Sequence, residues 1–276
     1  MLRQNSEYKI GSYQQIETKN GDLMVKIQLV DTQTDEKHNC VIWEDCLQKI
    51  PKKALRVGNI ISIIDSDYND KFNNDKIKQI KLVKEVKIGL SEPERDEAFS
   101  KILKIVDSFQ NENLKKEITA LMLENAEFFK TSPAAKNHHH NYVGGLMTHV
   151  LECVDFAKSL FSVIPASINC ELILAGAIMH DFGKIFEYMV DMETGVIDID
   201  EEWQKIWISH IYWGFSWANQ RGFSELAHII ASHHGIKDYG ALVEPATKEA
   251  DLLYGLDYMS SRVGKLCAEE LEKSGV

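Results

Sequence analysis

Seven histidine and aspartate residues in the second half of the chain have the types and spacing of metal ligands. They are His149, the adjacent pair His180-Asp181, His210, the pair His233-His234 and Asp257. Imidazole and carboxylate groups together suit Mn, Fe, Zn, Co or Ni, and an aspartate can bridge two ions with its two oxygens. A lone His-Asp pair is more often a satisfied core histidine with a helix cap. The repetition of such residues favours a metal site here.

The elements that must position these residues are expected to be helices. The segment Glu171–His180 is apolar except at its ends, which is typical of a central helix buried on all sides. The polar residues His180 and Asp181 at its end then need partners, and Gly183 is expected to end the helix in the left-handed conformation. The other helices are predicted at Ala98–Phe109, Leu114–Phe129, Met147–Phe161, Trp203–Arg221, Ser224–His234 and Lys248–Lys273.

The first third of the chain instead predicts a small barrel. Five short alternating or β-branched runs are separated by turn signals such as Asn20-Gly21 and Asn73-Asn74. A helical turn at Asp45–Ile50 falls where an oligonucleotide/oligosaccharide-binding (OB) fold carries its helix. The expected strands are Tyr8–Ile16, Leu23–Val30, His38–Trp43, Ile60–Asp65 and Lys76–Val86.

A domain boundary is expected close to residue 88. Ser91 and Glu94 have the spacing of a capping box at the start of a helix. The predicted fold is therefore α+β with two domains, an OB-type barrel over residues 1–88 and an all-α bundle over residues 89–276.

Composition separates the same two parts. The net charge is -11, which argues against a general nucleic-acid binder, but residues 1–90 carry a net charge of +2 and the remainder -13. The five cysteines include no C-x-x-C pair, so they are interpreted as reduced core residues. Without a secretory signal or a membrane-spanning apolar run, the protein is expected to be cytoplasmic.

Two sets of motifs carry a resemblance to known families. The order His149, His180-Asp181, Asp257 resembles the H…HD…D pattern of the HD superfamily of metal-dependent phosphohydrolases. The segment from His139 to His149 is similar to the HHxYxGGLxxH signature of the YhaM-type 3′→5′ exoribonucleases, which place an OB domain before the HD domain. Similar stretches surround Ala175–Lys184, Ser209-His210 and Ser232–Gly235.

The resemblance implies a mechanism with two ions bridged by Asp181. One ion would be held by His149, His180, Asp181 and Asp257, and the other by Asp181, His210, His233 and His234. The bridged pair would make a hydroxide available for in-line attack on the phosphate. Lys184 would neutralise phosphate charge, or alternatively would be a solvated residue after the helix. His139 and His140 would contact the phosphate, or equally support the ligands from behind.

The last ligand has two candidates. Asp257 is assigned by register, with Asp251 as the weaker alternative. Six residues separate them, so on a helix they point to different faces and only one can join the site.

A single nucleic-acid strand would bind through aromatic and basic side chains of the barrel. The candidates are Tyr13, Trp43, Tyr68, Phe72, Lys76 and Lys78. For any one aromatic residue core packing is the stronger interpretation, and the lysines can equally protect an edge strand. Trp203, Trp207, Trp213 and Trp217 are interpreted as core or subunit interface, which permits a homo-oligomer.

Three functions follow from these residues and the resemblance. The leading one is a metal-dependent 3′→5′ exoribonuclease that acts on single-stranded RNA and can also accept single-stranded DNA, with two divalent ions per chain. Manganese is the first choice of metal, with Fe, Co or Ni as alternatives. The other two are an HD phosphohydrolase of a small nucleotide, such as a nucleoside phosphate or cyclic dinucleotide, and a non-catalytic single-strand-binding adaptor.

Overall fold

The chain divides into two compact units in a computed structural model that describes residues 1–136, 138–206 and 208–274. The first unit comprises Met1–Ile88 together with Asp191–Val196, and the second comprises the remaining described residues. The first is a closed barrel and the second is mainly helical, so the predicted α+β fold with two units is confirmed. No helix within the described ranges is long and apolar enough to cross a membrane.

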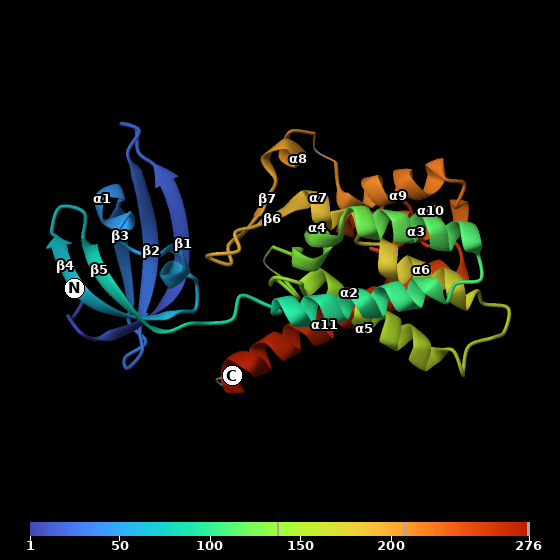
Figure 1. Ribbon diagram of the computed structural model, residues 1–276, viewed down its shortest axis with the longest axis horizontal. Coiled ribbons are helices and arrows are strands. Elements are labelled where there is room, and N and C mark those ends of the chain that lie inside the picture. The colour runs from blue at the N-terminus through green and yellow to red at the C-terminus, as the bar shows by residue number, and fades with distance from the viewer. Residues whose placement is uncertain (137, 207, 275–276) are drawn as a thin grey trace. The chain divides into compact units, whose positions relative to one another are not determined.

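The barrel has five strands in the order β1-β2-β3-β5-β4, closed by pairing of β4 with β1 (Figure 1). Strands β3 and β5 are parallel and the other neighbours antiparallel. This order, with a short helix between β3 and β4, is the predicted OB-type arrangement. The strands are β1 Glu7–Glu17, β2 Leu23–Asp31, β3 Lys37–Trp43, β4 Ile60–Asn69 and β5 Asn74–Lys84.

Alternation along the strands fills the barrel. Val25, Ile27 and Leu29 of β2 are buried, and they pack with Ile42 of β3 and Ile61 of β4 in one apolar cluster. The helical turn predicted at Asp45–Ile50 is found as the shorter α1, Glu44–Leu47, followed by the 3-10 turn η1, Lys52–Leu55.

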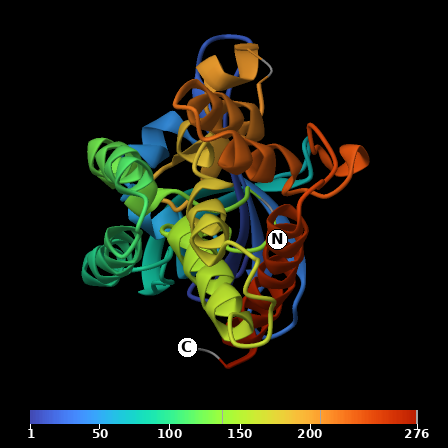
Figure 2. The ribbon, with the colours of Figure 1, turned by 90° about the vertical axis from the view of Figure 1, so that its right-hand side faces the viewer.

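The second unit packs its helices around α6 (Figures 1 and 2). Helix α6 contacts α5, α10 and α11, and α2 contacts it to a smaller extent. The helices are α2 Glu92–Asp107, α3 Glu112–Glu124, α4 Ala126–Thr131, α5 Gly145–Leu160, α6 Cys170–Met179, α7 Lys184–Glu187, α8 Glu201–Ile206, α9 His210–Gln220, α10 Ser224–Ser232 and α11 Lys248–Ser274, with the 3-10 turn η2 Lys237–Tyr239.

Helix α2 begins where its capping box predicts. The carboxylate of Glu94 accepts the backbone N–H of Ser91 at 2.6 Å, and the box is complete. One donor at the helix start is thereby satisfied.

Two predicted helices were wrong as single elements. The segment Leu114–Phe129 divides at Asn125, whose backbone leaves the helical region between α3 and α4. The segment Trp203–Arg221 divides into α8 and α9, because Ser209 is extended (φ -81°, ψ 158°) and a new helix begins at His210. Helix α7 and the hairpin of β6 Tyr188–Val190 with β7 Ile197–Ile199 were not predicted.

The tryptophans of α8 and α9 pack inside the second unit. Trp203 stacks on Phe186 at 6.2 Å, Trp213 lies 4.9 Å from the same ring, and Trp217 packs near Phe223. The core interpretation holds for Trp217, which is buried, and for Trp213, which packs against the apolar core, whereas Trp203 is half-buried. Trp207 lies outside the described residues, and a homo-oligomer stays a prediction.

Candidate metal centre

The end of α6 delivers His180 and Asp181 into the interior. Every residue from Leu172 to Met179 is buried, and the exposed fractions of His180 and Asp181 are 0% and 1%. A carboxylate is costly to bury without partners of opposite charge. The core position of α6 therefore requires cations or donors around Asp181.

Gly183 does not have the left-handed conformation that we expected. Its φ is -59° and the chain continues through a turn into α7. A Cβ at this position would lie 2.5 Å from the backbone oxygen of His210. The glycine is needed because it lets the start of α9 approach the end of α6.

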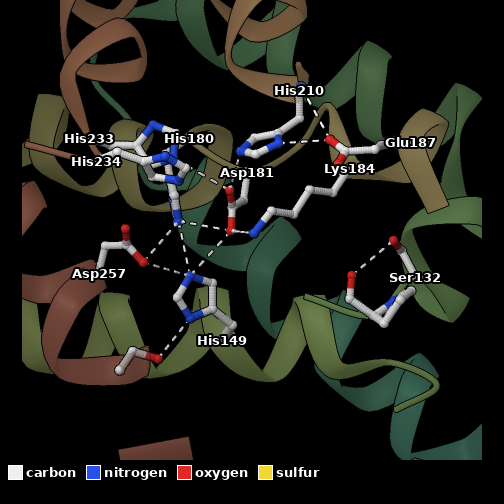
Figure 3. Close-up of polar contacts among 12 residues, drawn as sticks. Ser132, His149, His180, Asp181, Lys184, Glu187, His210, His233, His234 and Asp257 are labelled. Carbon is white, nitrogen blue, oxygen red and sulfur yellow. Dashed lines mark hydrogen bonds and ion pairs between the residues drawn. The ribbon is translucent and has the colours of Figure 1, made fainter. Parts of the chain in front are cut away.

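The structure brings all seven predicted ligands together around Asp181 (Figure 3). They come from five helices or helix ends. His149 lies in α5, His180 and Asp181 follow α6, His210 begins α9, His233 and His234 follow α10, and Asp257 lies in α11.

The two oxygens of Asp181 face different histidines. Oδ2 lies 3.5 Å from His149 Nε2 and 3.4 Å from His180 Nε2. Oδ1 lies 3.2 Å from His210 Nε2 and 3.5 Å from His233 Nε2. We call the first group, with Asp257, the Oδ2 half-site, and the second, with His234, the Oδ1 half-site. This arrangement matches the bridging role expected for Asp181.

Asp257, rather than Asp251, faces the centre. Its Oδ1 lies 3.2 Å from His149 Nε2 and 3.9 Å from His180 Nε2. Asp251 is exposed one and two-thirds turns earlier on α11.

Each histidine is held by its Nδ1, which leaves Nε2 directed inward. A backbone carbonyl can only accept a hydrogen bond, so Nδ1 must donate wherever a carbonyl is its partner. The Nδ1 partners are Ala177 O for His180 (3.0 Å), Ile230 O for His233 (2.7 Å), Tyr239 O for His234 (2.8 Å), Glu187 Oε2 for His210 (2.8 Å) and Ser260 Oγ for His149 (2.8 Å). In the neutral ring each Nε2 is then a bare lone pair, the form that binds metal.

These lone pairs face one another and carboxylate oxygens rather than strong donors, and the weak S–H donor of Cys153 lies 4.0 Å from His149 Nε2. His149 Nε2 and His180 Nε2 face each other at 3.0 Å, although neither neutral ring has a proton there to share. Among the residues that the structure describes, Asp181 Oδ1, His210 Nε2 and His233 Nε2 have no hydrogen-bond partner, and all three atoms are buried. Buried acceptors so arranged fit divalent cations, and Asp181, His210, His233 and His234 can all offer atoms to one ion.

Burial and neighbouring charges shift the pKa values of the clustered ligands in opposite directions. Burial opposes ionisation of Asp181, but Lys184 and His180 outweigh it and hold the pKa of Asp181 well below its usual value. Burial lowers the pKa of His149 and of His233. For His180 and His210 burial is outweighed by Asp181, with Glu187 assisting at His210, and the pKa of each is raised. The carboxylates thus stay ionised, which favours a bound cation.

Lys184 is not the solvated residue of the alternative interpretation. Its exposed fraction is 7%, and Nζ lies 2.6 Å from Asp181 Oδ2. The ammonium therefore sits at the edge of the Oδ2 half-site (Figure 3).

His139 and His140 lie beside His149. Their ring centroids are 5.0 and 5.6 Å from the His149 ring. Burial, followed by the proximity of His149, lowers the pKa of His139 to about 3. His140 has a left-handed backbone (φ 51°), and a Cβ on Gly145 would collide with its carbonyl oxygen. That close approach explains why Gly145, the second glycine of the Gly144-Gly145 pair, carries no side chain.

Three residues that support the ligands were missed from the sequence. Glu187 binds both the ring and the backbone N–H of His210. Ser260 accepts from His149 and donates to Glu152 Oε2 at 2.7 Å. Glu152 also lies 3.2 Å from His140 Nε2. No spacing in the sequence marks a single serine or glutamate as the partner of a metal ligand. Only the fold shows these contacts.

The barrel candidates lie in different places. Side chains alternate along a strand, so the buried Ile42 of β3 places its neighbours Val41 and Trp43 on the outer face of the barrel. Lys76 of β5 pairs with Val41 and therefore lies on the same face. Tyr13 packs against the barrel core, as the core interpretation has it. Lys78 is neutralised by Asp67 at 2.6 Å. Tyr68 and Phe72 belong to the β4–β5 hairpin, where Phe72 is 65% exposed.

Family comparisons place the site within a known domain. A family model described as "HD domain" matches residues 146–262, and one described as "Putative helicase" matches residues 83–169. The second unit is therefore similar to HD domains over residues 146–262, a range that includes all seven clustered ligands.

The particular relatives are exoribonucleases by name. Proteins named 3′-5′ exoribonuclease YhaM are 30% identical over 181 residues in Listeria innocua, covering 62% of this chain and 56% of the relative. The protein of that name in Oceanobacillus iheyensis is 28% identical over 195 residues, covering 67% of this chain and 59% of the relative. The resemblance to the YhaM-type family is thus confirmed, and the chain spans a little over half the length of these relatives. No solved structure matches.

Proposed function

We propose that this chain is a divalent-metal-dependent hydrolase that removes nucleotides from the 3′ end of single-stranded RNA. The observation that carries the proposal is the position of Asp181 between two groups of bare imidazole nitrogens. The printed name of the similar proteins supports RNA as the substrate and 3′→5′ as the direction.

The Oδ2 half-site would hold one ion through His149, His180, Asp181 and Asp257. The Oδ1 half-site would hold a second through Asp181, His210, His233 and His234. Divalent ions bound there would polarise a phosphate oxygen and supply a nucleophilic water at neutral pH. Manganese suits the Oδ1 half-site, whose donors are nitrogen and oxygen.

The protein's own side chains would orient and neutralise the phosphate. Lys184 Nζ lies 2.6 Å from Asp181 Oδ2 and is well placed to pair with a phosphate oxygen. His139, with its pKa near 3, stays neutral at physiological pH and offers a hydrogen bond rather than a charge. Glu187 and Ser260 keep the rings of His210 and His149 from rotating.

The barrel, residues 1–88, would bind the strand, and residues 89–276 would perform the hydrolysis. Trp43 and Lys76 share the outer face of neighbouring strands, with Lys26 on β2 opposite Val41. A stacking surface beside positive charges is what a single strand requires. Tyr68 and Phe72 on the β4–β5 hairpin, and Lys78, are secondary candidates, whereas the core position of Tyr13 makes it the weakest.

The test uses one RNA labelled in parallel at the 5′ end or at the 3′ end, incubated with protein and Mn²⁺. The 5′-labelled strand should give a descending ladder, and the 3′-labelled strand should release labelled mononucleotide at once. EDTA should stop both reactions. Intact RNA, together with hydrolysis of a nucleoside phosphate or cyclic dinucleotide, would replace the proposal by the small-nucleotide function, and single-stranded DNA tests sugar selectivity in the same assay.

A further inference from the structure

Cys153 lies inside the Oδ2 half-site, although its sequence context predicts only a core residue. It is fully buried on α5 one turn after His149, and its Sγ lies 4.0 Å from His149 Nε2. Residues four apart share a helix face, so the thiol and the imidazole point the same way.

Three buried donor atoms converge at this point. Cys153, His149 and His180 each offer one ligand atom, and these atoms lie within 4.8 Å of one another. Both nitrogens are bare lone pairs for the reason given above, and they face each other at 3.0 Å. Asp257 Oδ1 adds an oxygen 3.2 Å from His149 Nε2. The sulfur-to-nitrogen distance of 4.0 Å is a few tenths of an ångström longer than the roughly 3.6 Å that tetrahedral zinc geometry gives a sulfur and a nitrogen ligand.

We propose that the Oδ2 half-site is selective for a thiophilic divalent ion, such as zinc or cobalt, and that Cys153 is one of its ligands. The proposal rests on the metal centre of the proposed function and adds a difference between its halves. The donors of the Oδ1 half-site are nitrogen and oxygen alone, which suit manganese, whereas a thiolate favours softer ions. On binding, the Cys153 S–H bond breaks, its proton passes to solvent and the sulfur keeps the electron pair for the ion.

The experiment titrates metal-free protein with Co²⁺ and records the near-ultraviolet charge-transfer absorption that a thiolate–cobalt bond produces. Wild type should develop a band equivalent to one thiolate per chain. Cys153→Ser and Cys153→Ala should lose it, and cobalt affinity should fall by at least the roughly 10- to 100-fold that loss of a ligand's supporting contact costs. Cys170→Ser, at the half-buried start of α6, is the matched control and should keep the band.

Absence of the band from wild type would overturn the proposal without any variant, and so would a band that survives in folded Cys153→Ser. If RNA hydrolysis with Mn²⁺ persists in either case, only the assignment of Cys153 fails. Failure of wild type to bind any divalent ion would overturn the proposed function as well.

Discussion

The hydroxyl of Ser260 lies 2.8 Å from His149 Nδ1, across 111 positions of sequence. Because Ser260 Oγ donates to Glu152 Oε2, it accepts the Nδ1 proton of His149 and leaves Nε2 free. A ligand on α5 is thus oriented by a side chain on α11.

Ser260→Ala should therefore weaken divalent metal binding by roughly 10- to 100-fold, because the ring of His149 loses the contact that fixes its tautomer. Calorimetric titration with Mn²⁺ and Co²⁺ measures the change. Ser261→Ala is the control, since that hydroxyl only donates to the carbonyl of Tyr258. Equal affinities in both variants would show that Ser260 does not position His149.

The two candidate aspartates of α11 should behave oppositely. Asp257→Asn removes a half-buried negative charge beside His149 and should reduce bound metal by at least one ion per chain, together with RNA hydrolysis. Asp251→Asn changes an exposed residue and should match wild type. Metal analysis of both proteins decides between them, and loss of metal from the Asp251 variant alone would reverse the assignment.

Gly183→Ala should destabilise the protein by about 1–3 kcal/mol, because the new methyl group would meet the backbone oxygen of His210. Metal affinity should fall with it, since His210 must move. Gly255→Ala, in α11 with no atom within 4 Å of the added carbon, should be neutral or stabilising by up to about 1 kcal/mol. Urea unfolding compares the two, and an unchanged midpoint for Gly183→Ala would contradict the packing described for α6 and α9.

The metal-free protein should lose stability as pH falls. Burial lowers the pKa of His139 to about 3 from 6.5, so the unfolded chain binds a proton that the folded chain refuses over that interval. The contribution of His139 is full above pH 6.5 and decreases as the pH falls towards 3. Urea midpoints between about pH 7 and pH 4 should drop, less so in His139→Asn than in His138→Asn, which alters an exposed neighbour. Identical slopes in these two variants would contradict the buried position of His139.

Local sequence patterns predicted most of the strands and helices and the position of the central helix. Alternation indicated five strands, the Ser91–Glu94 spacing located the start of α2, and apolar burial identified α6 as central. The order of His and Asp residues, together with the resemblance to the H…HD…D pattern, predicted the side chains that meet, with Asp251 left as an alternative to Asp257.

Contacts between distant segments could not be predicted in this way. The break before His210 depends on Glu187 capturing its backbone N–H, and the role of Gly183 depends on where α9 begins. Cys153 looked like any apolar residue of a buried helix face, because its neighbour His180 lies on another helix.

The most direct test of the central claim compares Asp181→Asn with Asp155→Asn, an exposed aspartate on α5. Manganese binding and shortening of 5′-labelled RNA are measured on the same preparations, with circular dichroism to establish folding. Asp155→Asn should keep both properties, and folded Asp181→Asn should lose both. A folded Asp181→Asn protein that binds manganese normally and still produces the 3′→5′ ladder would contradict the central claim.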